Sequence, residues 1–133
     1  MDKRRISKDY QEIGERLINT QNELIDILNS EAIIIFLASE HAKKARDKTI
    51  FAECEKVSEK YKWGIPADFT ITVFEPNVAN FTPDQIEILL FHELLHVGID
   101  FKADGDEAYF VKPHDLEDFK VIIDKYGTEW NQA

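Results

Sequence analysis

Residues 82–97, TPDQIEILLFHELLHV, carry the clearest structural pattern of the sequence. The start of this stretch carries three helix-initiation signals: Thr82 as the cap, Pro83 at the first helical position and Gln85 placed to complete a capping box. Its second half is apolar almost all round, which is typical of a helix buried at the centre of a domain. The stretch therefore predicts a central helix that runs to about Val97 and is ended by Gly98 in a left-handed cap.

Three polar side chains interrupt this apolar helix: His92, Glu93 and His96. Buried imidazoles and carboxylates carry a desolvation cost unless they are partnered, and one bound cation would satisfy all three. Residues four apart project from the same helix face with β-carbons about 6 Å apart, so both imidazoles can bind one ion at about 2.0–2.1 Å. Glu93 points about 100° around the helix axis from His92, where a general base takes a proton from metal-bound water. The pattern predicts a zinc site with a catalytic carboxylate.

A catalytic zinc ion needs a third protein ligand and one open position. We predict His114 for this ligand, because it follows His96 by 18 residues, enough chain to return to the site. Glu117 or Asp118, one turn into the next predicted helix, is the competing ligand and would give a His-His-Glu type of site. His41 has no partner at ligand spacing and is expected to be exposed.

Several residues around the motif are candidates for supporting roles. Ligating imidazoles usually donate their second N–H to a carboxylate or carbonyl, and the candidate carboxylates are Asp100, Asp115 and Asp118. Tyr109 could donate to a developing oxyanion, although a strand or packing role is the interpretation that we favour. The acidic stretch at residues 100–107 lacks the ligand pattern of a calcium loop and is expected to be a solvated loop bordering the cleft.

The remaining apolar patterns predict an α+β fold. Thr20 and Glu23 match a capping box that would start a second, short helix. Helical periodicity occurs at residues 9–19, 24–28 and 116–126, and strand-like patterns occur at residues 32–37, 49–54 and 69–73. This order predicts N-terminal helices, a small three- to four-stranded mixed sheet, the buried motif-bearing helix and a C-terminal helix.

Composition fits one globular domain over residues 1–133, with 44% apolar and 32% charged residues. The longest apolar run, residues 32–38, is far shorter than a membrane-spanning helix, and the N-terminus has no signal-peptide pattern. Cys54 is the only cysteine, which excludes an intramolecular disulfide and a cysteine-based zinc site and favours a reducing compartment, the cytoplasm.

The formal net charge of −10 disfavours non-specific binding to nucleic acid or to anionic lipid. One local exception is a basic cluster that could touch phosphate but is more typical of a solvated loop: Lys43, Lys44, Arg46 and Lys48. We therefore expect neither a nucleic acid nor a membrane as a partner.

Two histidine segments resemble the phage metallopeptidases, small zincin-like proteins of phages and bacterial genomes. They are FHELLHVG at residues 91–98 and PHDLEDF at residues 113–119, and weaker similarity occurs at residues 51–54, 63–76 and 126–127. The resemblance covers most of the chain and implies a minimal zincin-like fold. It also implies that His92, His96 and His114 bind zinc and that Glu93 is the catalytic acid/base. SprT-like metallopeptidases, which also follow this motif with a later histidine, are more distantly similar.

These patterns together predict a zinc-dependent peptidase that acts on a peptide or protein substrate. The main alternative is a zinc-binding interaction module that cleaves nothing. A second alternative is a SprT-like protease acting on DNA-associated protein, against which the acidic net charge counts. The sequence predicts neither the cleavage specificity nor the oligomeric state.

Overall fold

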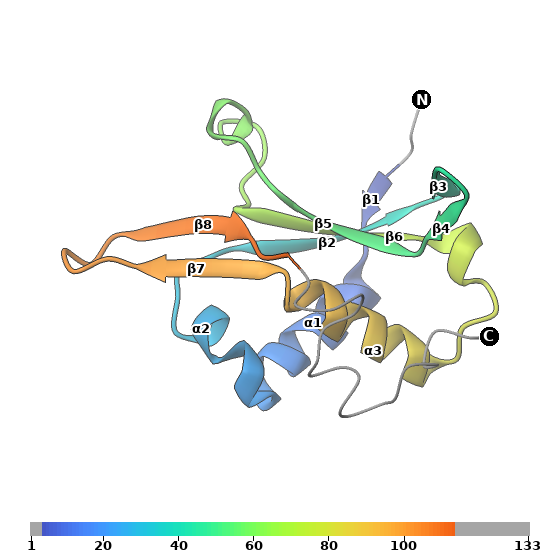
Figure 1. Ribbon diagram of the computed structural model, residues 1–133, viewed down its shortest axis with the longest axis horizontal. Helices are drawn as coiled ribbons and strands as arrows, with labels where there is room; N and C mark the ends of the chain where they lie inside the picture. The colour runs from blue at the N-terminus through green and yellow to red at the C-terminus, as the bar shows by residue number, and fades with distance from the viewer. Residues whose placement is uncertain (1–3, 114–133) are drawn as a thin grey trace.

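The computed structural model describes residues 4–113, which form an α+β fold with the three α-helices packed on one face of a small sheet (Figure 1). The helices of this part are α1 (Lys8–Thr20), η1 (Asn22–Leu24), α2 (Ile25–Leu28), η2 (Glu59–Tyr61), η3 (Glu75–Val78) and α3 (Pro83–Leu94). The strands are β1 (Arg4–Ile6), β2 (Ile34–Ser39), β3 (Lys43–Ala45), β4 (Lys48–Ile50), β5 (Ala52–Lys56), β6 (Phe69–Phe74), β7 (Val97–Phe101) and β8 (Glu107–Val111).

The main sheet has four strands in the order β1-β2-β6-β5. Strands β2 and β6 are parallel, whereas β1 and β5 pair antiparallel with their neighbours, so the sheet is mixed as predicted. Phe36 of β2 and Cys54 of β5 both lie opposite Ile71 of β6. Because side chains alternate between faces along each strand, these three residues point to the same, helix-covered face.

The core lies between this face and the helices. Its fully buried side chains come from α1, α3 and the two inner strands, among them Leu17, Leu90, Phe91, Phe36 and Ile71. Helix α1 approaches β2 closely at Gly14, where an added β-carbon would overlap the ring of Phe36. Glycine at this position therefore lets the helix sit directly on the aromatic ring.

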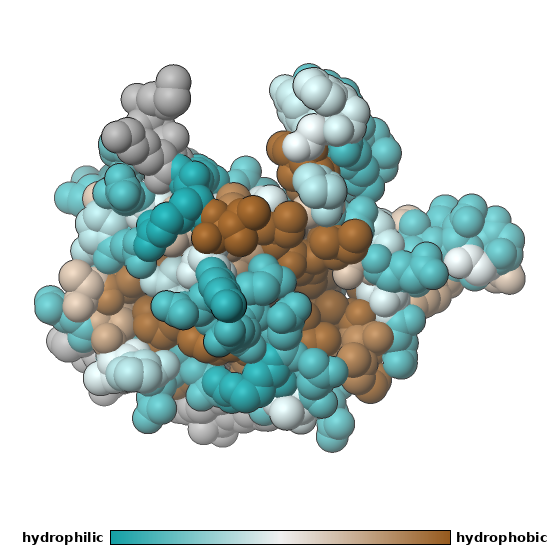
Figure 2. All heavy atoms as spheres, turned by 180° about the vertical axis from the view of Figure 1, so that it is seen from behind, coloured by the Kyte–Doolittle hydropathy of each residue, from teal (hydrophilic) through white to brown (hydrophobic). Residues whose placement is uncertain are grey.

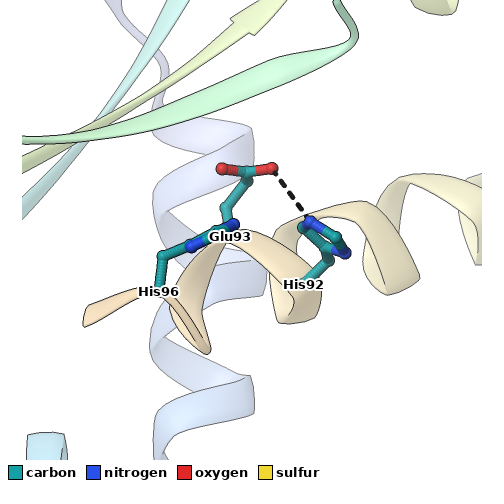
Figure 3. A group of neighbouring side chains, drawn as sticks. All are labelled: His92, Glu93 and His96. Atoms are coloured by element: carbon teal, nitrogen blue, oxygen red, sulfur yellow. Dashed lines mark ion pairs between the residues drawn. The ribbon is translucent and has the colours of Figure 1, made fainter. Parts of the chain in front are cut away.

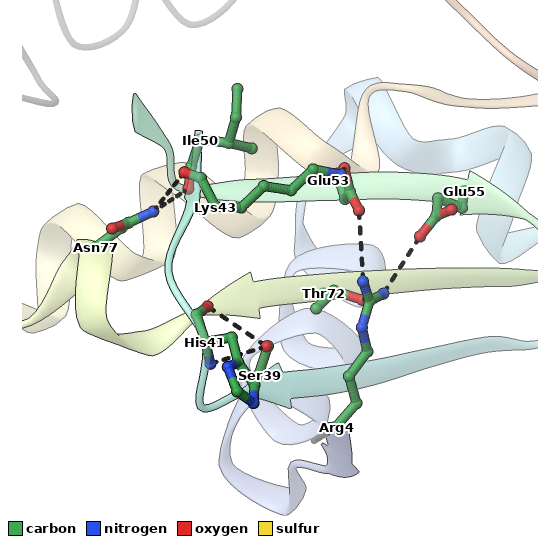
Figure 4. Close-up of polar contacts among 9 residues, drawn as sticks. All are labelled: Arg4, Ser39, His41, Lys43, Ile50, Glu53, Glu55, Thr72 and Asn77. Atoms are coloured by element: carbon green, nitrogen blue, oxygen red, sulfur yellow. Dashed lines mark hydrogen bonds and ion pairs between the residues drawn. The ribbon is translucent and has the colours of Figure 1, made fainter. Parts of the chain in front are cut away.

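The opposite face of the sheet carries a polar network centred on Arg4 of β1 (Figure 4). The guanidinium donates to the hydroxyl of Thr72 (3.1 Å) and to Glu55 (3.4 Å), and it pairs with Glu53 at 3.8 Å. Thr72 is fully buried beneath it. The network therefore reaches from one edge strand of the sheet, across β6, to the other edge strand, β5.

Several predictions of elements are confirmed. Helix α1 matches the expected helix at residues 9–19, and the capping box of Thr82 and Gln85 is formed in full at the start of α3. Strand β2 is present two residues later than predicted, and β6 matches the strand at residues 69–73. The alternation of apolar residues with threonines at residues 69–73 predicts a half-exposed strand, which is wrong, because five of the six residues of β6 are buried.

Other predictions need correction. Thr20 does not cap a second helix: it is the last residue of α1, and its hydroxyl donates to the carbonyl of Arg16 (2.8 Å). The strand expected at residues 49–54 is two strands, β4 and β5, which belong to different sheets. The basic cluster forms the exposed β3–β4 hairpin rather than an irregular loop.

The largest correction concerns the segment that follows α3. The helix ends at Leu94 instead of Val97, and Gly98 lies inside strand β7 rather than in a left-handed cap. The acidic stretch at residues 100–107 belongs to the β7–β8 hairpin, in which Val97 pairs with Val111. The predicted C-terminal helix lies outside the described residues. No helix within residues 4–113 is long and apolar enough to cross a membrane.

Candidate metal centre

The end of α3 brings His92, Glu93 and His96 together (Figure 3). One potential ligand atom from each residue lies within 4.8 Å of the other two, and the two imidazole centroids are 5.3 Å apart. The Nε2 atom of His92 is 3.8 Å from Oε2 of Glu93. The Glu93 carboxylate thus stands between the two rings.

His96 itself lies just beyond the helix. The last helical turn tightens, since the N–H of His96 donates to the carbonyl of Glu93, three residues back, at 3.0 Å. The chain then enters β7 directly at Val97. Helical geometry alone therefore does not hold the second imidazole in place.

Strand β8 supplies the missing constraint through Lys112, the residue that follows its end. The N–H of Lys112 donates to the carbonyl of His96 (2.6 Å), and Nδ1 of His96 is 2.6 Å from the carbonyl of Lys112. A carbonyl can only accept, so Nδ1 carries the proton and Nε2 is left with the lone pair that a metal needs. We call this pair of bonds the Lys112 latch.

For His96, the carbonyl of Lys112 takes the role that we predicted for a carboxylate. Asp100 is exposed on β7, whereas Asp115 and Asp118 lie outside the described residues. A backbone carbonyl has no side-chain signature, so sequence inspection missed Lys112. The one available signal is Pro113, because the residue before a proline is restricted to extended conformations such as the one that continues β8.

The carboxylate of Glu93 is buried, with only 5% of the residue exposed, and it points toward the sheet in Figure 3. Cys54 of β5 lies close by on the helix-covered face of the sheet. Burial, together with the negative charge of Glu93, raises the pKa of the Cys54 thiol. Glu93 therefore occupies a shielded position beneath the edge strand β5, where electrostatic interactions are stronger than in water.

The other predicted site residues fall into two groups. Tyr109 has the packing role that we favoured: its ring contacts Phe69 edge-on at 5.7 Å, and its hydroxyl donates to Glu107 (2.8 Å). His41 is exposed, as expected. His114, Glu117 and Asp118 lie outside the described residues, so the third ligand stays a prediction.

The donor set fits a zinc ion. Two imidazole nitrogens and a neighbouring carboxylate are ligand types that zinc accepts, and ligands of a tetrahedral zinc ion lie about 3.4 Å from one another at bond lengths of about 2.0–2.1 Å. The observed separations, at most 4.8 Å, exceed this by no more than about 1.4 Å, a difference within the reach of side-chain rotation. Among the described residues, no other group of histidine, cysteine and acidic side chains has this geometry.

Comparison with models of protein families gives a match over residues 4–133 to the family described as "Putative phage metallopeptidase". The match covers nearly the whole chain and includes both histidine segments. No curated protein and no solved structure matches the chain significantly.

Proposed function

The chain belongs to the phage metallopeptidase family, and from this premise we propose that it is a zinc-dependent peptidase in which Glu93 is the general base. One observation carries the proposal: a buried carboxylate stands between two imidazoles whose potential ligand atoms lie within 4.8 Å of it and of each other. A structural role alone would not require two histidines and a glutamate to converge in an otherwise apolar helix end.

His92 and His96 would hold the ion, and the Lys112 latch would present Nε2 of His96 to it. A bound zinc ion supplies a Lewis acid that polarises the scissile carbonyl and lowers the pKa of water toward 7. Glu93 accepts the proton of the attacking water on a carboxylate oxygen and later passes it to the leaving amine nitrogen. Burial of Glu93 keeps bulk water away from this proton transfer.

We assign the third ligand to His114, with Glu117 or Asp118 as the alternatives. All three lie in the segment that the family match covers. With histidine as the third ligand, all three protein ligands would be uncharged. With Glu117 or Asp118, the ligands would be two histidines and a carboxylate. Either choice keeps one coordination position open for water.

The substrate class is a peptide or protein, and the compartment that we propose is the cytoplasm. Cys54 is the only cysteine of the chain, and its thiol is partly buried, which suits a protein that works without disulfides. The net charge of −10 supports a role that does not involve nucleic acid.

Two variants test the function. Glu93→Gln should bind zinc as the wild type does and lose about 10²–10⁴-fold in turnover, since it removes the base and keeps the side-chain size. His96→Ala should lose zinc. Zinc content is measured by elemental analysis, and turnover is measured with an unfolded polypeptide whose fragments are identified by mass spectrometry.

A zinc-loaded wild-type protein that leaves every bond of this polypeptide intact would support an interaction module instead. Normal turnover by the Glu93→Gln variant would show that Glu93 is not the base.

A further inference from the structure

The segment at residues 57–68, which joins β5 to β6, forms a loop that we call the arm. Its two ends meet, because the N–H of Val57 donates to the carbonyl of Asp68 (2.9 Å). Val57 and Ala67 are buried at its base. A compact loop with closed ends is an Ω-loop, a type that frequently carries function.

The arm reverses the usual distribution of polar and apolar side chains. Lys62 points inward, where its ammonium group pairs with Asp68 (2.9 Å) and Glu59 (3.2 Å). Its neighbour Trp63 is 91% exposed, and Tyr61 and Ile65 are 51% and 40% exposed. Clusters of large exposed apolar residues are uncommon in soluble proteins and mark binding surfaces. The ammonium group of Lys60 lies over the ring of Tyr61, 5.0 Å from its centroid, which leaves Trp63 as the most exposed of the three side chains.

The arm follows the strand that lies over the candidate metal centre. It starts directly after β5, and the last residue of this strand, Lys56, lies two positions beyond Cys54, which is close to Glu93. Figure 1 shows the arm rising at that end of β5, above the end of β8.

A depression of about 430 Å³ separates the arm from the β7–β8 hairpin. Its lining comes from β5, the arm and the hairpin: Lys56, Glu59, Lys62, Lys102, Asp106, Glu107, Ala108 and Tyr109. Figure 2, seen from behind, shows the arm projecting upward and the hairpin projecting to the right, with a concave corner between them.

The lengths of β5 and β8 indicate how far this depression lies from the metal centre. Along β8 and its end, five residue steps lead from Glu107 in the depression to Lys112 beside His96, about 17 Å of extended chain. Along β5, two steps lead from Cys54 to Lys56, about 7 Å. An extended polypeptide that leaves the metal centre in this direction would enter the depression after about two to five residues, and there it would meet Glu59 and Lys62 of the arm.

We propose that the arm is a docking element for polypeptide substrates, in which Trp63, flanked by Tyr61 and Ile65, binds an apolar side chain several residues away from the cleaved bond. The inference rests on the proposed peptidase function and adds a substrate requirement to it. A substrate must be long enough to span the depression and must carry an apolar residue there. Folded proteins with no extended segment would not satisfy this requirement.

Kinetics with substrates of two lengths test the proposal. The long probe is reduced, carboxymethylated lactalbumin, and the short probe is a six-residue peptide spanning a bond cleaved in it. Trp63→Ala should raise KM for the long probe about ten- to hundredfold with unchanged kcat, because the contact is remote from the reacting atoms. It should leave both constants unchanged for the short peptide.

Two further variants are controls. Trp63→Phe should restore most of the affinity, since it keeps an aromatic surface. Ile6→Ala truncates another exposed apolar residue, 67% exposed, at the opposite edge of the sheet and should change nothing. Equal losses on both probes, or no loss on either, would overturn the docking role.

A binding assay separates this inference from the peptidase function. The sequence has two tryptophans, Trp63 and Trp130, so a Glu93→Gln/Trp130→Phe protein reports on Trp63 alone by fluorescence. Its emission should shift to the blue when reduced, carboxymethylated ribonuclease A, an unfolded polypeptide that contains no tryptophan, is added. The shift can occur even if the wild type cleaves nothing, which would refute the peptidase and keep the docking element. An unchanged emission beside normal cleavage would refute the docking element and keep the peptidase.

Discussion

The Lys112 latch makes a prediction about the metal-free protein. Because Nδ1 of His96 lies 2.6 Å from a carbonyl oxygen, His96 should be the Nδ1–H tautomer before any metal binds. Nitrogen-15 NMR of the imidazole distinguishes the two tautomers directly. Finding the proton on Nε2 of His96 in the folded, metal-free protein would refute the assignment of Nε2 as the metal-binding atom.

The latch can be weakened without touching a ligand. Pro113 restricts the conformation of Lys112. Replacing a loop proline by glycine gives the backbone more conformations, and ordering that backbone then costs about 0.4–1 kcal/mol more. Since about 1.4 kcal/mol corresponds to tenfold in affinity, Pro113→Gly should weaken zinc binding about two- to fivefold. Competition with a coloured chelator measures a change of this size.

Pro66→Gly is the matched control, because Pro66 is an exposed proline on the arm, away from the latch. This variant should lose a similar amount of stability and bind zinc as the wild type does. The reasoning fails if the two variants bind zinc equally well, since the conformation of Lys112 would then have no effect on His96.

Three other predictions follow from the packing, the thiol and the unassigned ligand. Gly14→Ala should lower the free energy of unfolding by about 1–3 kcal/mol despite the better helix propensity of alanine, because the added methyl group would meet the fully buried ring of Phe36. Gly98→Ala should be nearly neutral, because the ring of Phe110 that it would meet is partly exposed and can move. Urea unfolding of both variants tests the difference. Burial raises the pKa of the Cys54 thiol in the folded protein, so the unfolded chain loses the thiol proton at a lower pH than the folded protein does. The free energy of unfolding should therefore fall above about pH 8.5, by up to about 1.4 kcal/mol per pH unit. Cys54→Ala should reduce this slope in denaturation curves. His114→Ala should abolish tight zinc binding, while Glu117→Gln and Asp118→Asn should retain it; the opposite pattern would transfer the third-ligand role to a carboxylate.

The sequence predicts α3 well because the signals for its start are local. Thr82 and Gln85 bond each other's backbone within one turn, so their spacing in the sequence is their spacing in space. The end of α3 was predicted wrongly because two patterns overlap there. Val97, Ile99 and Phe101 alternate as a strand does, yet Val97 also continues the apolar face of the helix, and Gly98 suits a helix cap as well as a strand.

The arm shows a different limit of sequence interpretation. Trp63 and Ile65 have the composition of core residues, and nothing local indicates that Lys62 between Tyr61 and Trp63 is the residue that turns inward. That choice depends on Asp68 and Glu59 being placed around its ammonium group, which only the closed loop achieves. Pairing between strands decides similar questions elsewhere, such as the division of residues 48–56 into β4 and β5.

The end of α3 at Leu94, rather than at Val97 as predicted, also changes how the metal centre is understood. If α3 continued to Val97, helical spacing alone would place His96 over His92, and the motif would be complete within one element. Because the helix ends at Leu94, the position of His96 depends on the Lys112 latch and hence on the β7–β8 hairpin. The same hairpin lines the depression beneath the arm. The hairpin that lines the depression is therefore also the element that orients one of the proposed zinc ligands.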